Sequence, residues 1–218
     1  MTGPGPAGRP EVVCVGLTTV DTVYTVAHHP APDEKITAAR QDLAAGGPAA
    51  NAAVTCSALG SRTTLVTALG SHPLAAVAAD YLHRHGVEVV DATPDDASAP
   101  ALSSIYVQPA TATRSVVSVN AADRSVPAPP ALDGLVGGAR VVLVDGHHPD
   151  LLRSALVYII SVIIAEQFVQ SFTILFSFIQ CFYIIPDESE YFPYIVLYNN
   201  AIDNLRGALC SALTSNES

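Results

Sequence analysis

The sequence predicts an α/β fold in which helices cover the faces of a parallel sheet. Short β-rich runs at 12–17, 63–69 and 87–90 alternate with two stretches of helical composition, at 48–59 and 73–85. This alternation is typical of strands that are joined by crossover helices. The run at 12–17 is apolar throughout, as expected of a strand that is buried on both faces of a sheet.

The length and charge of the chain narrow the class of protein. A chain of 218 residues can bury a substantial core and form one domain or one and a half. Half of the residues are hydrophobic, only 14% are charged, and the formal net charge is −10. The single lysine, Lys35, and nine dispersed arginines form no basic stripe along a phosphate backbone, so we expect no nucleic-acid partner.

The cysteines and the amino terminus indicate a cytoplasmic protein. The four cysteines are far apart and form neither a Cys-x-x-Cys pair nor a Cys/His cluster, so we expect reduced thiols and no metal site: Cys14, Cys56, Cys181 and Cys210. Residues 1–11 lack an apolar core segment and are predicted to form a flexible tail rather than a signal peptide.

The composition changes abruptly after residue 155. All six phenylalanines lie beyond this point, whereas all seven histidines and fourteen of the sixteen prolines precede it. Residue types with GC-rich codons dominate the first part, and types with AT-rich codons dominate the second. We therefore predict a junction near 155–157, arising from a fusion, a frameshift or an assembly error, which divides the chain into 12–155 and a segment of unassigned fold at 156–218.

A glycine pair precedes the first predicted helix. Gly46 and Gly47 allow positive φ and a close approach of a ligand to the backbone, Pro48 suits the first helical turn, and a glycine at 60 suits the stop. The free N–H groups and the positive dipole end of this helix would point toward whatever lies over the glycines. Asn51 lies one turn into the helix, where its amide can donate to and accept from hydroxyl groups. The alternative is a tight strand-to-helix turn with Asn51 as a local cap.

These residues recur in the order found in one enzyme family. The first strand is followed by Asp21 and then by Gly46-Gly47-x-x-x-Asn51-x-Ala53, which resembles the PfkB (ribokinase-like) carbohydrate kinases over 12–155, about two thirds of the chain. The resemblance implies a ribokinase-like three-layer parallel sheet with a small β lid. The lid would comprise about 20–45 and 101–120, and the C-terminal part of the fold would be truncated or replaced.

The resemblance also implies which residues bind a small-molecule sugar. Asp21 follows the first strand, where open α/β sheets bind their ligands, and would accept sugar hydroxyls together with Asn51. The backbone of Gly46 and Gly47 would pack against the sugar. For Asp21 the alternative is a surface turn residue. The lid of the family can also mediate homodimers.

Two further candidates have structural alternatives. Arg114 follows the turn between the two β-rich runs of the second lid segment, where relatives often carry an arginine, but a solvated edge-strand arginine fits equally. Asp145 ends the apolar run 140–145 and either lines the cleft or caps the turn that follows.

The parts of the family that carry catalysis are not found in the sequence. ATP and Mg²⁺ are implied as cofactors by the resemblance, but the family's Asp-Thr-x-Gly-Ala-Gly-Asp motif, which supplies the anion hole and the catalytic base, is absent. A Walker-type glycine loop and the Asn-x-x-Glu motif associated with magnesium are absent too. After the third strand, Gly70-Ser71-His72 also lacks the usual acidic residue. No catalytic residue is assigned.

We therefore predict a sugar or nucleoside kinase by ancestry, which does not turn over as this chain alone. One alternative is a non-catalytic sugar-binding or dimerising module. Another is a fusion fragment attached to a membrane through 156–185, since the apolar stretch is long enough for a helix of about 20 residues. Its Ser, Thr and Gln content disfavours a membrane span. A buried helix or strand pair and an aggregation-prone segment stay open.

Overall fold

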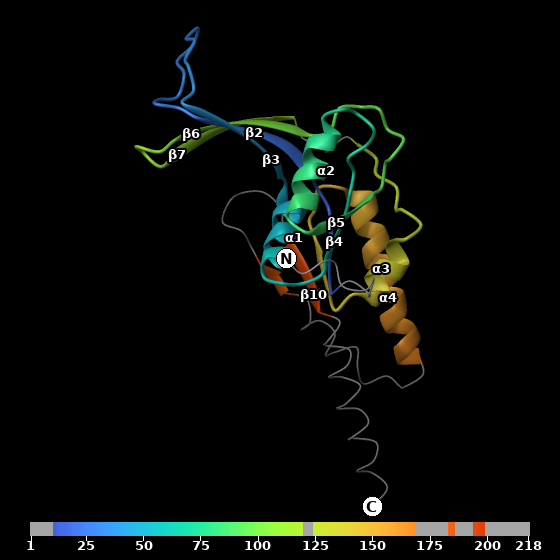
Figure 1. Ribbon diagram of the computed structural model, residues 1–218. Coiled ribbons are helices and arrows are strands. Elements are labelled where there is room, and N and C mark those ends of the chain that lie inside the picture. The colour runs from blue at the N-terminus through green and yellow to red at the C-terminus, as the bar shows by residue number, and fades with distance from the viewer. Residues whose placement is uncertain (1–10, 120–123, 169–182, 186–193, 199–218) are drawn as a thin grey trace, which may run out of the picture.

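The computed structural model describes residues 11–119, 124–168, 183–185 and 194–198, which contain two sheets and four helices (Figure 1). The larger sheet has six strands in the order β5-β4-β1-β8-β10-β9. In chain order these strands are β1 (Val12–Val15), β4 (Thr63–Thr67), β5 (Val87–Asp91), β8 (Val141–Val144), β9 (Tyr183–Ile185) and β10 (Tyr194–Tyr198).

The first four strands of this sheet confirm the predicted parallel arrangement. β1 is central, and its Cys14 is paired in parallel with Leu65 of β4 and Leu143 of β8. β5 extends the parallel set beyond β4. β10 pairs antiparallel with β8, and β9 pairs antiparallel with β10, so the sheet is mixed beyond β8.

Helices cover both faces of the sheet and give the predicted three layers. α1 (Pro48–Ala58) and α2 (Ala75–Arg84) lie on one face, and α3 (Leu132–Gly138) and α4 (Pro149–Phe168) lie on the other. Successive strand residues point to opposite faces, so Cys14 belongs to the core beneath α1 and α2, and Val13 to the core beneath α3 and α4. Both side chains are fully buried.

The smaller sheet is the predicted lid and projects away from the body (Figure 1). Its strand order is β3-β2-β6-β7. The strands are β2 (Thr19–Thr25), β3 (Arg40–Gly46), β6 (Leu102–Gln108) and β7 (Thr113–Val119). β2 pairs antiparallel with β3 and parallel with β6, so the two sequence-distant halves of the lid meet along β2.

Two lid boundaries differ from the sequence-based expectation. β2 begins at Thr19, so Asp21 lies inside a strand rather than in a turn. β3 begins only at Arg40, well inside the lid segment expected at about 20–45. The Glu34 carboxylate accepts hydrogen bonds from the backbone N–H of Ala31 at 2.9 Å and from His28 at 2.9 Å, which folds the preceding residues into a loop.

The segment beyond 155 is described only in part. α4 continues through the predicted junction at 155–157 to Phe168, and the expected closing helix at 199–213 lies outside the described residues. Among the helices of the described ranges, none is long and apolar enough to cross a membrane. The division of the chain at 155 stays a prediction.

Candidate functional site

The glycine pair lies where β3 of the lid passes into α1 of the body. Gly47 is the N-cap of α1 and has φ +94°, a conformation that residues with a side chain rarely adopt. A Cβ at this position would lie 2.4 Å from the carbonyl oxygen of Leu17. Glycine is therefore required for the lid strand to enter the helix beside the end of β1.

Asp21 lies directly against this junction. Gly46 is paired with Thr19 across β2 and β3, and a Cβ on Gly46 would lie only 1.9 Å from Oδ2 of Asp21. The hydroxyl of Thr19 donates to Oδ1 of Asp21 at 2.7 Å. The carboxylate is thus held in place through its Oδ1, and it lies over backbone that carries no side chain at Gly46. The missing side chain of Gly46 creates the space that it occupies.

Asn51 lies one turn into the same helix. Its backbone N–H donates to the carbonyl oxygen of Gly47 at 2.9 Å, and its side chain is exposed. No side-chain hydrogen bond caps α1 from its N-cap residue, and the Asn51 amide makes none with the described residues, so Asn51 is not a local cap. Asp21 thus lies on β2 against Gly46, and Asn51 lies on α1, four residues after Gly47.

Asp145 caps α1 from a distant part of the chain. Its Oδ2 accepts hydrogen bonds from the backbone N–H groups of Leu17 at 2.9 Å and Ala49 at 3.0 Å. Its Oδ1 accepts from the backbone N–H of His147 at 3.0 Å. The side chain is buried, and it lies so close to Gly16 that a Cβ there would be 2.3 Å from the carboxylate. Asp145 therefore joins the ends of β1 and β8 to the first turn of α1, and capping, the second of the two roles considered for it, is the one observed.

Arg114 lies away from these residues. It is exposed on β7, an edge strand of the lid, and pairs with Val107, which in turn pairs with Thr25 of β2. Thr25 is four residues from Asp21, so Arg114 is displaced by about 13 Å along the strands and by two strand spacings of about 4.8 Å. The described structure does not bring Arg114 to the glycine pair.

Sequence analysis did not single out Thr19, the partner of Asp21. The signal was present, because residues two apart in a strand lie on the same face. It was missed because Asp21 was expected to follow the first strand, with a surface turn as the alternative, and not to lie inside the next strand beside Thr19.

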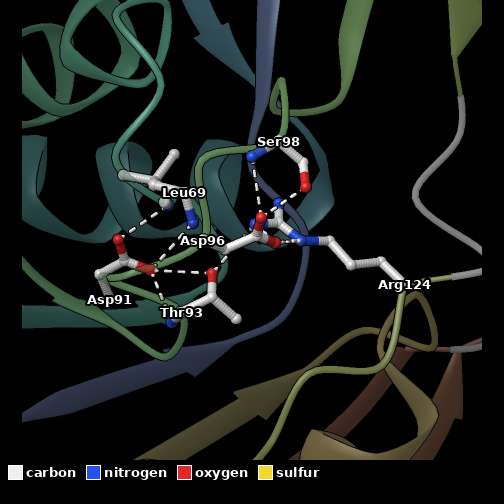
Figure 2. A network of polar contacts seen from close by, with 7 residues as sticks. Leu69, Asp91, Thr93, Asp96, Ser98 and Arg124 are labelled. Atoms are coloured by element: carbon white, nitrogen blue, oxygen red, sulfur yellow. Dashed lines mark hydrogen bonds and ion pairs between the residues drawn. The ribbon is translucent and has the colours of Figure 1, made fainter.

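A second polar cluster lies at the carboxyl ends of β4 and β5 (Figure 2). The sequence lacks an acidic residue after Gly70, but Asp91 at the end of β5 accepts hydrogen bonds from the backbone N–H groups of Leu69 at 3.0 Å and Gly70 at 2.8 Å. His72 accepts a hydrogen bond from the Leu74 backbone at its Nδ1, which gives it a structural role near the start of α2. The carboxylate of Asp91 on the neighbouring strand thus contacts the loop in which the sequence lacks an acidic residue after Gly70.

His148 is the most unusual buried polar group near this edge. Its side chain is 2% exposed, and neither ring nitrogen has a hydrogen-bond partner among the described residues. Burial is the main cause that lowers the pKa of His148 below its usual value, opposed by the charge of Asp145. The ring is therefore neutral near pH 7.

Possible ligands for a metal ion can be examined among the described residues. Within these ranges no group of three or more His, Cys, Asp or Glu side chains could hold a metal ion. The start of α1 has free backbone N–H groups, but one is already used by Asp145. Around Gly46, the Asp21 carboxylate is a hydrogen-bond acceptor and the backbone carries no Cβ, while the exposed amide of Asn51 offers both a donor and an acceptor.

The sequence matches a known family over most of its length. The model of the pfkB family carbohydrate kinases matches residues 9–171. The chain therefore belongs to the pfkB family of carbohydrate kinases. No curated protein matches the chain significantly.

Solved structures share the fold. A protein from Agrobacterium tumefaciens assigned as a ribokinase has a TM-score of 0.59 and 24% identity, covering 69% of this chain and 49% of its own. A carbohydrate kinase from the same organism has a TM-score of 0.52 and 18% identity, covering 66% of this chain and 48% of its own. A microbiome-derived acarbose kinase has a TM-score of 0.53 and 18% identity, covering 61% of this chain and 44% of its own. The chain thus spans about half the length of these relatives.

Proposed function

We propose that this chain is the sugar-binding part of a carbohydrate kinase that transfers the γ-phosphate of ATP to a hydroxyl of a sugar or nucleoside. The observation that carries the proposal is the Asp21 carboxylate, which lies against Gly46 at the entrance to α1. Membership of the pfkB family supports the reaction class.

The proposed roles follow from the chemistry of each group. Asp21 accepts hydrogen bonds from two sugar hydroxyls, with Thr19 fixing the carboxylate by the bond to Oδ1. Asn51 binds a third hydroxyl, since an amide both donates and accepts. The backbone of Gly46 and Gly47 packs against the sugar ring, because no Cβ keeps the ligand at a distance.

Phosphoryl transfer needs more than this part supplies. The reaction depends on groups that position the phosphates and stabilise their charge, and a base must take the proton of the attacking hydroxyl. The sequence lacks the family motif that provides the anion hole and the base. We therefore expect the chain by itself to bind a sugar and to leave ATP unhydrolysed and the sugar unphosphorylated.

Calorimetric titration of the full chain with a panel of sugars and nucleosides, D-ribose and D-fructose among them, tests this proposal. We expect one class to bind, and Asp21→Asn to weaken its binding about tenfold or more, because a buried carboxylate–hydroxyl bond contributes about 1.5–3 kcal/mol. Asp42→Asn is the matched control, since Asp42 lies on β3, is 43% exposed and pairs only with Arg40. Equal binding by both variants would overturn the assignment of Asp21. Sugar phosphorylation by the unaltered chain would overturn the expectation that this chain alone is inactive.

We also propose that the lid mediates a homodimer. The edge strand β7 exposes several valines, and Val117 and Val119 are each 68% exposed. Exposed apolar side chains on an edge strand favour association with a second strand. Light scattering during gel filtration should give a dimer mass for the chain and a monomer mass for Val117→Glu. A monomer in both cases would reject this interface.

A further inference from the structure

The β6–β7 hairpin makes up half of the lid and is joined to the body at two places. Residues 92–101 lead from β5 into β6, and the chain after β7 returns through Arg124 and Val126 to α3. Val126 is 1% exposed and belongs to the core beneath α3 and α4. The orientation of the hairpin relative to the body depends on how these two connecting segments are held.

An ion pair joins residues 92–101 to the segment that begins at Arg124. Nε and Nη2 of Arg124 donate to Oδ2 of Asp96 at 2.9 and 2.5 Å (Figure 2). Nη2 also donates to the hydroxyl of Thr93 at 3.2 Å. The side chains of Arg124 and Asp96 are only 15% and 31% exposed. This pair therefore differs from an ordinary surface pair, which is solvated and contributes little.

The acidic partner is itself fixed to the body. The carbonyl oxygen of Asp96 accepts a hydrogen bond from the backbone N–H of Ser71 at 2.7 Å, beyond β4. Oδ1 of Asp96 accepts from the backbone N–H of Ser98 at 2.8 Å and from its hydroxyl at 2.5 Å. Asp91 accepts from the backbone N–H of Thr93 at 2.9 Å. The segment before β6 is thus held to the ends of β4 and β5, and Arg124 attaches to it the segment that begins at 124 and leads into α3.

The position of the hairpin affects the candidate sugar site through β2. β6 pairs in parallel with β2, and Ser103 of β6 lies directly opposite Asp21. The hydroxyls of Ser103 and Ser118 of β7 are 3.2 Å apart on the same row of the sheet. A tilt of the hairpin would therefore move the strand that flanks Asp21.

We propose that the Arg124–Asp96 ion pair is a clasp that positions the β6–β7 hairpin of the lid and, through β2, the sugar-binding carboxylate of Asp21. Arg124 is a positioning residue in this scheme and does not contact the sugar. The effect on the hairpin stands on the contacts above, and the effect on sugar binding rests on the proposed function.

Hydrogen–deuterium exchange of the full chain, followed by mass spectrometry, tests the clasp. In Arg124→Gln we expect the amides of β6 and β7 to exchange roughly tenfold faster, while those of β1 and β4 keep their rates, because opening is local. Arg84→Gln is the matched control. It removes the exposed Arg84–Asp80 ion pair on α2 and should leave the lid unchanged.

Sugar titration of the same variants separates the clasp from the function. We expect Arg124→Gln to raise the Kd of the best-bound sugar about fivefold, and Arg124→Lys to recover part of the loss because the charge is kept. Unchanged exchange in β6 and β7, or equal acceleration throughout the chain, would overturn the clasp. If the lid amides respond but no sugar binds even the unaltered chain, the clasp stands and the proposed function fails.

Discussion

The carboxylate of Asp145 accepts a hydrogen bond from the backbone N–H of Ala49 at 3.0 Å, although 96 residues separate them. The N-cap of α1 is Gly47, which has no side chain to satisfy the first N–H groups of the helix. A carboxylate from the end of β8 takes that role and places a negative charge at the positive end of the helix dipole. The glycine pair is thus compatible with a stable helix because the cap comes from elsewhere in the chain.

Replacement of Asp145 should therefore be among the most destabilising single changes in the described part of the chain. Asp145→Ala leaves three backbone N–H groups near β1, α1 and β8 without acceptors, and an unsatisfied buried donor costs about 1–3 kcal/mol. We expect the free energy of unfolding to fall by about 3 kcal/mol or more, and by about 2 kcal/mol for Asp145→Asn, which keeps one acceptor oxygen. Urea unfolding measures the free energy of unfolding of both variants.

Asp150 provides the matched control for this measurement. It is 53% exposed and forms a 3.5 Å ion pair with Arg153, so Asp150→Asn should change the free energy of unfolding by less than about 0.5 kcal/mol. If Asp145→Asn were as mild as Asp150→Asn, the proposed capping role would be wrong.

Gly46→Ala tests the close contact between the lid strand and Asp21. The added methyl group would lie 1.9 Å from Oδ2 of Asp21 and 2.7 Å from the hydroxyl of Thr19, so the carboxylate must move. We expect sugar affinity, measured by calorimetry, to fall about tenfold or more and the free energy of unfolding to fall by about 1–3 kcal/mol.

Gly134→Ala is the control for this change. Gly134 lies within α3, and a Cβ there would meet nothing within 4 Å. Because alanine favours helix, this variant should be more stable by about 0.5–1 kcal/mol and bind sugar normally. Equal sugar affinity in the two variants would show that the space above Gly46 is not needed.

Local patterns in the sequence predicted most of the elements around the site. The apolar run of β1, the glycine pair and Pro48 defined the strand and the start of α1, because backbone conformation and burial at these positions depend on the residues themselves. The role of Asp145 could not be read in the same way, since its partners Leu17 and Ala49 are distant in sequence. The same holds for Asp91, which lies on the neighbouring strand and accepts a hydrogen bond from the backbone N–H of Gly70. Contacts across a parallel sheet depend on strand order, which local patterns do not encode.

The thiols of Cys14 and Cys56 give a prediction about reactivity. They share a hydrogen bond between β1 and α1, which lowers the pKa of Cys56 to about 6, and this bond together with burial raises that of Cys14. Cys56 should therefore react with iodoacetamide as a thiolate at pH 7, whereas Cys14 should not react in the folded protein.

Loss of Cys14 should raise the pKa of Cys56. In Cys14→Ala we expect the midpoint of the alkylation rate against pH to rise from about 6 toward the usual value of 9.0. The rate at pH 7 should fall only about fourfold, because a thiolate of higher pKa is more nucleophilic. Mass spectrometry of the Cys56 peptide measures this, with the Cys181 and Cys210 peptides as reference rates. A midpoint that stays constant on removal of Cys14 would rule out the shared hydrogen bond.

The buried imidazole of His148 should make stability depend on pH. Burial lowers the pKa of His148 in the folded protein, whereas the unfolded chain keeps a value near 6.5. As the pH falls below about 6.5, the unfolded state takes up a proton that the folded state does not, so the free energy of unfolding decreases. Between pH 7 and 5.5 we expect the free energy of unfolding to fall more for the unaltered chain than for His148→Phe, which has no titrating group there. Urea unfolding at several pH values measures the two slopes. Parallel slopes for the unaltered chain and His148→Phe would mean that His148 is protonated equally in both states.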